Sequence, residues 1–534
     1  MSTPMPDNQA VARKTTTQFN QKFAEVAESC RPKLHEWIER PLEVMSFKPD
    51  TSAWFQCHPA HRMTIDELAS TPVGKGDDFI LDFGGHRVGY FSFHLGAVGN
   101  NIDAPCRLRL TFGEVPPDVT ENLADCKSWI STSWLPDEVI NVDWLPTNVD
   151  MPRRYSFRYV RIQVIDTSQQ YRALFSDVRV RAVSSVSPET FNSVPALNDS
   201  RPLLHKIDAV SQRTLRNCMH TVFEDGPRRD RRLWSGDLRL QALTNYATFK
   251  DFALVKRCLY MFAAVAGADG SLPACLYEFP TLHAASDYIV DYDALFGAMV
   301  YDYAVASSDL DTARDLWPTV VGSLTTALSH LSPTTGAFDS ARSDLWKFLD
   351  WDLTLHADAG MHGVVLYCCK RVDALAELLG YPPRYEAAIA SMTAAATTAF
   401  YDSAAGVFVS GPAHQISWLS QAWLALAGAL PPDQSMAALL RTMKDPAALK
   451  PLCPYGWATF AEALAVCGAK EECLKLLETY WGGMVERGAD TFWECFDPKD
   501  YRKSPYQDYR NNSYCHAWSC SPAWLLRSVL FPDS

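Results

Sequence analysis

The chain has 534 residues, which is too long for one hydrophobic core and predicts roughly two to four domains. Hydrophobic residues make up 47% and aromatic residues 12% of it, a composition that is typical of a folded protein with a substantial core and excludes a disordered chain. The formal net charge of -13 disfavours nucleic acid or an anionic membrane as a partner, and a neutral substrate fits better.

The first residues predict neither a secretion signal nor a membrane anchor. Residues 1–17 lack a continuous apolar stretch and are expected to form a flexible tail. No run of eighteen consecutive apolar residues occurs, so no transmembrane helix and a cytoplasmic location are predicted. The fifteen cysteines are an odd number without a CxxC pair, which favours reduced thiols over disulfides or zinc. Phosphate-binding and dinucleotide motifs are absent as well, so no metal and no cofactor are expected.

The segment from residue 18 to 195 predicts an N-terminal helix followed by a β-sandwich. Residues 19–40 have the pattern of an amphipathic helix. Strand-sized pieces with alternating polarity follow, separated by turn-forming glycines and prolines. These pieces are residues 79–83, 89–95, 107–112 and 157–164.

From residue 196 to 534 the hydrophobic periodicity becomes helical. The segments are mostly 12 to 20 residues long and alternate with turns rich in glycine and proline, and the longest periodic stretch covers residues 238–266. Helices in hairpin order predict a toroid of six helical hairpins, an (α/α)6 barrel. Such a barrel gathers its loops at one end, where distant segments can converge on one pocket.

Two segments about 265 residues apart place carboxylates beside a tryptophan. Residues 225–237 read DGPRRDRRLWSGD, and residues 488–494 read GADTFWE. Cleavage of a glycosidic bond without a metal needs one carboxyl group that protonates the leaving oxygen and another that activates water or attacks the sugar. Tryptophan offers a flat apolar face to a pyranose, and arginines orient carboxylates. An arginine-rich and aspartate-rich loop alone is more often a structural ion-pair network, but the tryptophan motifs favour a sugar-cleaving site.

The two segments resemble the catalytic motifs of the α-L-rhamnosidases of glycoside hydrolase family 78. The second extends back to residue 480, and residues 515–519, CHAWS, are similar to the late histidine motif of that family. Residues 82–84 and 157–160 more weakly resemble its accessory domain. The chain resembles a short, two-domain member.

The resemblance implies an inverting hydrolase with an (α/α)6 catalytic barrel that releases terminal rhamnose from a small glycoside or oligosaccharide. Asp230 occupies the position of the general acid and Glu494 that of the general base. The other residues expected to contact the substrate are Asp225, Arg229, Trp234, Asp237, Asp291, Tyr292, Trp346, Trp351, Trp493 and His516. A homodimer is also expected.

The chain departs from the family pattern at one catalytic position. Many members have glutamate where this chain has Asp230, so Asp225 or Glu224 stays open as the proton donor. Two other functions also stay open. One is an (α/α)6 enzyme for another deoxy-sugar or a uronic acid, or a phosphorylase; the other is a carbohydrate-binding protein that no longer cleaves its ligand.

Overall fold

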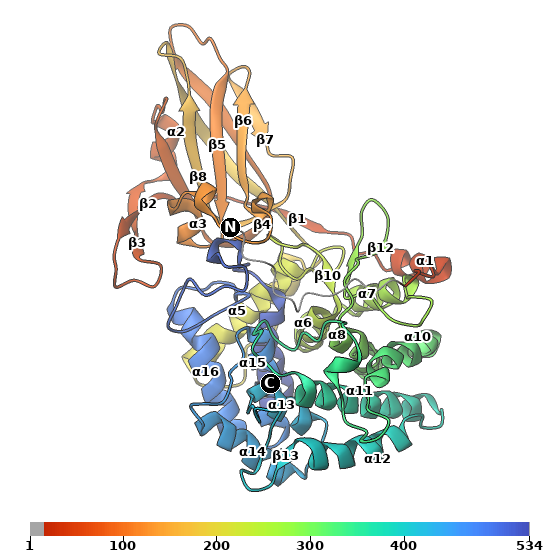
Figure 1. Ribbon diagram of the computed structural model, residues 1–534. Coiled ribbons are helices and arrows are strands. Elements are labelled where there is room, and N and C mark those ends of the chain that lie inside the picture. Colours follow the sequence, from red (N-terminus) through yellow and green to blue (C-terminus); the bar gives the residue numbers. More distant parts are fainter. Residues whose placement is uncertain (1–14, 533–534) are drawn as a thin grey trace.

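The computed structural model describes residues 15–532, in which a β-rich N-terminal domain stands on one end of a larger helical domain (Figure 1). Residues 1–14, most of the tail expected at 1–17, lie outside the described residues. Thr17 forms a β-bridge with Gly267 of the helical domain. None of the helices in the described part of the chain combines the length and the apolarity needed to cross a membrane.

Alternating residues build an antiparallel sheet in the N-terminal domain. In strand β5 (Cys106–Gly113), Cys106, Leu108 and Leu110 are buried while Arg107 and Arg109 between them are exposed, the period of two that a strand requires. The strands are β1 (His35–Glu39), β2 (Glu43–Pro49), β3 (Cys57–Met63), β4 (Asp78–Gly99), β5 (Cys106–Gly113), β6 (Asp137–Val142), β7 (Thr147–Asp150), β8 (Tyr155–Asp166) and β9 (Tyr171–Ser184). Short helices α2 (Ile65–Ser70), α3 (Pro116–Thr120) and α4 (Pro188–Asn192) accompany them.

The long strand β4 belongs to both layers of the sandwich. Its first part pairs with β8 and its second part with β9, so both layers belong to one sheet with the path β1-β9-β4-β8-β5-β6. Gly89 lies at the change of partner, where a Cβ would collide with the carbonyl oxygen of Arg181. Phe91, Phe112 and Phe157 fill the space between the layers. The predicted β-sandwich is therefore present.

The helix expected over residues 19–40 is shorter than the periodicity indicated. Helix α1 covers Gln21–Ser29, and the next element is strand β1, which pairs with β9. Pro32 disfavours helical conformation in the residue before it, which explains why the helix cannot continue. Phe23 of α1 packs edge-on against Tyr260 at 5.4 Å, so the helix lies on the helical domain rather than on the sheet.

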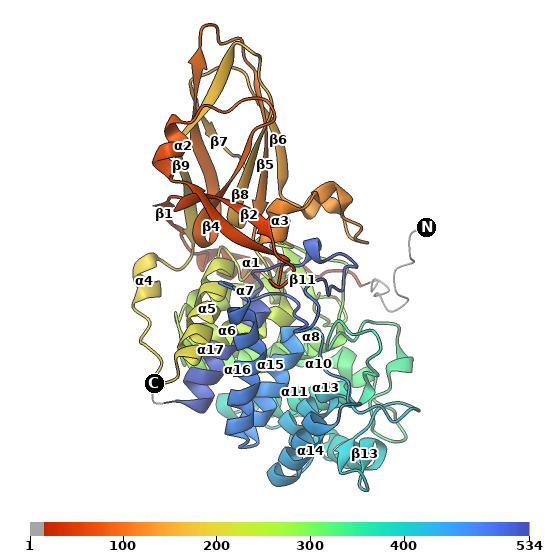
Figure 2. The ribbon, with the colours of Figure 1, turned by 90° about the vertical axis from the view of Figure 1, so that its left-hand side faces the viewer.

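The helical domain closes into a ring, because its first helix, α5 (Pro202–Cys218), lies beside its last one, α17 (Ser521–Trp524) (Figure 2). Arg527 forms an ion pair with Asp208 of α5 at 2.6 Å, which joins the two ends of the ring. The helices are α5 (Pro202–Cys218), α6 (Ser235–Ala247), α7 (Phe252–Ala264), α8 (Val290–Ala294), α9 (Phe296–Ser307), α10 (Leu310–Ser329), α11 (Asp358–Leu379), α12 (Glu386–Ala395), α13 (Trp418–Leu426), α14 (Pro432–Lys444), α15 (Pro454–Val466), α16 (Lys470–Glu486) and α17 (Ser521–Trp524). Short strands β10 (Leu233–Trp234), β11 (Cys275–Tyr277), β12 (His283–Ala284), β13 (Tyr401–Asp402) and β14 (Val407–Phe408) lie in the loops.

The periodic stretch 238–266 is two helices, not one. Helix α6 ends at Ala247 and α7 begins at Phe252. Lys250 between them has a φ of 58°, and the Asp251 side chain accepts the amide of Leu254 at 3.0 Å as an N-cap. The break ends α6 and lets α7 pack on α1, α9 and α10.

Candidate active site

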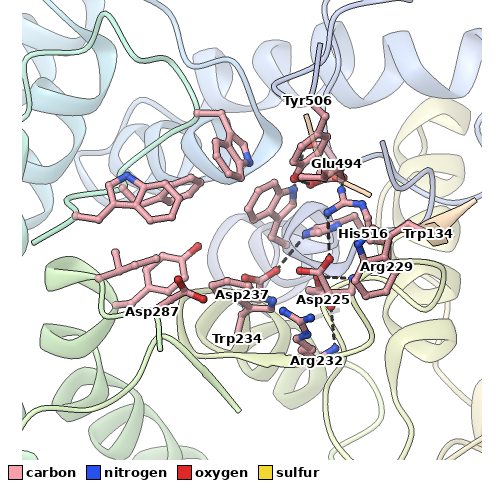
Figure 3. Close-up of a pocket in the computed structure, with 18 of the residues that line it drawn as sticks. Trp134, Asp225, Arg229, Arg232, Trp234, Asp237, Asp287, Glu494, Tyr506 and His516 are labelled. Atoms are coloured by element: carbon pink, nitrogen blue, oxygen red, sulfur yellow. Dashed lines mark hydrogen bonds and ion pairs between the residues drawn. The ribbon is translucent and has the colours of Figure 1, made fainter. Parts of the chain in front are cut away.

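A cavity of about 430 Å³ opens at the end of the ring that faces the N-terminal domain (Figure 3). It brings together the motifs at 225–237, 488–494 and 515–519, which lie in separate loops. Ten of the twelve side chains singled out in the sequence line it, namely Asp225, Arg229, Asp230, Trp234, Asp237, Tyr292, Trp346, Trp351, Glu494 and His516.

Asp225 shapes the loop of the first motif. Its carboxylate accepts the backbone amide of Asp230 at 2.9 Å and that of Arg232 at 3.1 Å, one on each oxygen. Its carbonyl oxygen accepts the amide of Ala517 at 2.8 Å, which docks the histidine motif against this loop. Because the backbone occupies both carboxylate oxygens of Asp225, Asp230 is the more accessible carboxylate, with 15% of its side chain exposed.

Glu494 is buried and held by three neighbours. Its Oε2 accepts Nη2 of Arg229 at 2.5 Å and the amide of Ser513 at 2.8 Å, and its Oε1 accepts the hydroxyl of Tyr506. Burial would raise the pKa of Glu494, but Arg229, His516 and these hydrogen bonds outweigh it and hold the pKa below the usual range. Glu494 is therefore ionised near neutral pH, as a group that takes a proton from water must be.

The two neighbouring carboxyl groups of Asp225 and Glu224 differ in their pKa. Burial, followed by the charge of Asp230, raises the pKa of Asp225 to about 7, so the carboxyl of Asp225 retains a proton up to near neutral pH. Glu224 is different, because burial is outweighed by Arg154 and His220, which lower its pKa to about 2. Glu224 also lies outside the cavity lining, which leaves Asp230 and Asp225 as the candidates for the proton donor.

Asp237 and His516 form a second polar pair in the cavity. The Nε2 atom of His516 lies 3.2 Å from Oδ1 of Asp237 on the first turn of α6. Burial would lower the pKa of His516, but the carboxylates of Glu494 and Asp237 raise it. The buried Nδ1 atom of His516 has no hydrogen-bond partner within residues 15–532, and a hydroxyl group of a ligand could satisfy it.

The four arginines of the first motif have different roles. Arg229 and Arg232 line the cavity, and Arg229 also contacts Asp230, with Nη1 at 3.3 Å from Oδ1. Arg228 points to the N-terminal domain, where it forms an ion pair with Asp118 at 2.7 Å. Arg231 donates to the carbonyl oxygen of Pro227 at 2.8 Å and supports the loop. Two of the four positive charges therefore act on the cavity.

Asp291 and Trp493 do not line the cavity. The buried carboxylate of Asp291 accepts the amides of Phe348 at 2.9 Å and Leu349 at 3.2 Å, and so shapes the loop that carries Trp346 and Trp351. Trp493 packs against Phe55 with ring centroids 5.8 Å apart. In an extended segment neighbouring side chains point to opposite sides, so Glu494 enters the cavity while Trp493 faces away.

Family models match nearly the whole chain. Residues 41–182 match the glycosyl hydrolase family 78 alpha-rhamnosidase N-terminal domain, and residues 193–529 match the bacterial alpha-L-rhamnosidase 6 hairpin glycosidase domain. The chain belongs to glycoside hydrolase family 78. The resemblance of the motifs and the (α/α)6 barrel are thus confirmed, and the protein is a glycoside hydrolase of the α-L-rhamnosidase type.

Solved structures agree with this assignment. A rhamnosidase from Klebsiella oxytoca with rhamnose bound is 39% identical, with a TM-score of 0.92 over 96% of this chain and 99% of that one. The family 78 rhamnosidase of Bacillus sp. GL1 shares the fold at 21% identity and a TM-score of 0.72, over 88% of this chain but 49% of that one. A Streptomyces avermitilis α-L-rhamnosidase complexed with L-rhamnose has a TM-score of 0.65 at 17% identity, over 93% of this chain and 44% of that one. A comparison with curated proteins finds no match.

Sequence reasoning missed several residues of this family 78 site. Trp518 belongs to the 515–519 motif and could have been found there, and Arg232 was part of the first motif without an assigned position. Phe348 lies in the segment that carries Trp346 and Trp351, and no motif marks the other cavity residues, which are Trp129, Ile130, Trp134, Asp287, Ile289 and Tyr506.

The rhamnosidase is expected to show a bell-shaped dependence of kcat/KM on pH. The carboxyl of Asp225, whose pKa is raised to about 7, is protonated below pH 7 and ionised above it, so we expect activity to fall on that side. Glu494 must be ionised, and its lowered pKa places the acidic limb below the usual glutamate range. Asp225→Asn removes the carboxyl that titrates near pH 7, so the alkaline limb of the variant should move away from that pH. Rates measured with an aryl α-L-rhamnoside between pH 3 and 10 would test this, and an unmoved alkaline limb in the variant would contradict it.

Proposed function

We propose that this family 78 enzyme hydrolyses terminal α-L-rhamnosides by a single displacement that inverts the anomeric centre. The observation that carries the proposal is the position of Arg229 between the two carboxylates, with one nitrogen on Asp230 and the other on Glu494. The guanidinium keeps the two carboxyls apart, as a general acid and a general base on opposite faces of a sugar require, and inversion itself is what the family resemblance implies. Inverting pairs are typically about 6.5–9.5 Å apart and retaining pairs about 5–5.5 Å.

Each group has a defined task in this reaction. Asp230 donates its proton to the glycosidic oxygen, and the bond between that oxygen and the anomeric carbon breaks. Glu494 takes a proton from a water molecule, whose oxygen attacks the anomeric carbon from the opposite face. One proton leaves Asp230 and one arrives on Glu494, and exchange with solvent restores both groups.

The remaining polar and aromatic residues would hold the sugar. Asp237 and the open Nδ1 of His516 supply an acceptor and a nitrogen partner for ring hydroxyls. Trp234 lines the cavity beside them and offers a flat face to the carbon side of the ring. The Klebsiella oxytoca rhamnosidase has rhamnose bound, which supports rhamnose as the sugar here.

The test uses p-nitrophenyl α-L-rhamnopyranoside with NMR observation of the first sugar released. We expect turnover without phosphate and β-L-rhamnose as the first anomer. Release of the α-anomer first would contradict inversion, and a phosphate requirement would indicate a phosphorylase. Cleavage of other aryl glycosides but not this one would show that the sugar is wrong, and binding of rhamnose without cleavage of any glycoside would indicate a binding protein.

Two further expectations belong to this proposal. The fifteen free cysteines support a reducing compartment such as the cytoplasm, and fractionation of cells that places the protein outside them would contradict it. The homodimer stays a prediction. Light scattering should give twice the chain mass of 59.7 kDa, and a monomer mass would contradict it.

A further inference from the structure

One loop of the N-terminal domain forms part of the catalytic cavity. Between α3 and β6, residues 122–136 extend to the cavity, where Trp129, Ile130 and Trp134 line it. We call these three side chains the loop wall.

The loop is fastened to the catalytic domain at three successive residues. The amide of Lys127 donates to Asp508 at 2.9 Å, the hydroxyl of Ser128 to the carbonyl oxygen of Tyr506 at 2.9 Å, and Nε1 of Trp129 to that of Pro505 at 2.9 Å. Arg510 adds two bonds back to the loop, at 3.1 Å each, to the carbonyl oxygens of Asn122 and Asp125. The loop wall is thus held in place by the domain that carries out the chemistry.

The loop wall stands on the side of the proton donor. The guanidinium of Arg232 lies over the ring of Trp134, 5.7 Å from the ring centroid. Arg232 follows Asp230 by two residues, so Trp134 lies close to the donor segment. In Figure 3, Trp134 lies on the side of Arg229, away from Asp287. The donor must lie within hydrogen-bond reach of the glycosidic oxygen, so the leaving group extends from the sugar toward this side.

An aromatic surface continues from Trp129 into the cavity. Trp129 packs on Tyr506 at 5.8 Å, and Tyr506 packs on Trp351 at 5.7 Å. Arg229 lies over the ring of Tyr506 at 4.2 Å and contacts Asp230, so this surface also adjoins the donor.

The chemistry of the loop wall favours an aromatic leaving group over a sugar. A sugar needs several partners for its hydroxyls, but Ile130 has no polar atom in its side chain and the Nε1 of Trp129 is already bound to Pro505, so Nε1 of Trp134 is the one side-chain donor that the loop wall can offer. Flat, apolar side chains gain most from a planar apolar ligand, through burial and ring stacking.

We propose that Trp134, with Trp129 and Ile130, forms the leaving-group subsite of this enzyme and selects a leaving group that carries an aromatic ring over a sugar. The proposal rests on the rhamnosidase activity proposed above. It makes the N-terminal domain a determinant of specificity, because the subsite exists only while the loop is docked.

The test compares benzyl, methyl and glucosyl α-L-rhamnosides as substrates. Benzyl alcohol and methanol have similar acidity, so the two leaving groups depart with similar intrinsic ease. The benzyl and methyl substrates then differ mainly in the contact between the benzyl ring and the loop wall. We expect Trp134→Ala to lower kcat/KM for the benzyl substrate by about tenfold, because the variant loses the stacking and partial burial of the benzyl ring. The decrease in kcat/KM should be clearly smaller for the methyl and glucosyl substrates. The inhibition constant of free L-rhamnose should be the same for Trp134→Ala and the wild type. Trp134→Phe should retain most of the kcat/KM on the benzyl substrate.

Trp144→Ala is the matched control, since this tryptophan of the same domain is 70% exposed and lies outside the cavity lining, and it should change none of the three rates. Equal losses on all three substrates, or no loss on the benzyl substrate, would overturn the proposal. A larger loss on the glucosyl substrate would overturn the preference for an aromatic group. A wild-type enzyme that cleaves none of the three would overturn the proposed function itself, and this inference with it.

Discussion

Replacing Glu494 with glutamine is expected to lower kcat by about 10³-fold with little change in KM, because the amide keeps the shape of the side chain but cannot take a proton from water. The carboxylate is held on both oxygens, by Arg229 and Ser513 on one and Tyr506 on the other, so the water-activating group is fixed in place. Steady-state kinetics on p-nitrophenyl α-L-rhamnopyranoside measures the effect.

Glu462→Gln is the matched control for this experiment. Glu462 is also a buried carboxylate paired with an arginine, Arg239, at 2.7 and 3.0 Å, but it does not line the cavity. The control should lose stability and keep its kcat. Similar losses of kcat in the two variants would mean that breaking any buried ion pair reduces activity, and the role of Glu494 as base would fail.

The same assay separates the two candidates for the proton donor. Nitrophenolate leaves without full protonation, whereas a methoxide cannot, so the variant of the true donor loses more activity on the methyl than on the p-nitrophenyl rhamnoside. We expect this signature for Asp230→Asn. If Asp225→Asn shows it and Asp230→Asn does not, Asp225 is the donor.

The second large effect is expected at the interface of the two domains, where Asp118→Ala should lower the free energy of unfolding by about 3–5 kcal/mol. Asp118 is 1% exposed and accepts both Nη1 and Nη2 of Arg228, at 2.7 and 3.1 Å. Burial raises the pKa of Asp118 despite the charge of Arg228. The ion pair stabilises the folded protein because, without its partner, each group would be an isolated buried charge. The substitution leaves Arg228 as that isolated charge, and urea denaturation measures the cost.

Two variants bracket this prediction. Asp118→Asn keeps an oxygen acceptor for Arg228 and should be less destabilised than Asp118→Ala. Asp311→Ala removes an ion pair with Arg314 at 2.9 Å whose aspartate is 95% exposed, and it should leave the urea midpoint unchanged. If Asp118→Ala behaves like Asp311→Ala, the buried pair does not stabilise the docked domains.

Kinetic data on Asp118→Ala would also show what the docking does for the site. Arg228 lies one residue before Arg229, which contacts both carboxylates, and its Nη2 also donates to the carbonyl oxygen of Arg510 at 2.9 Å. The N-terminal domain therefore supports the catalytic loop as well as the loop wall.

Local patterns in the sequence were sufficient for much of this description. Alternating polarity in strands such as β5 and a helical period after residue 196 predicted a sandwich followed by a barrel, because each element must bury one face. Where a local conformation competed, the periodicity was misleading. The helix expected over 19–40 stops at Ser29, and the stretch 238–266 breaks at residues 248–251.

The sequence by itself determined the family and the order of the domains, and it marked Asp230 and Glu494 as the predicted acid and base, because those residues lie in short contiguous motifs. Only the tertiary structure decided which neighbours point into the cavity. It places Trp493 and Asp291 outside, and it brings in Tyr506, Trp129 and Trp134, which no motif marks. The physical reason is that side-chain direction and domain docking depend on contacts between segments hundreds of residues apart, such as Trp129 with Pro505, and no local pattern records such contacts.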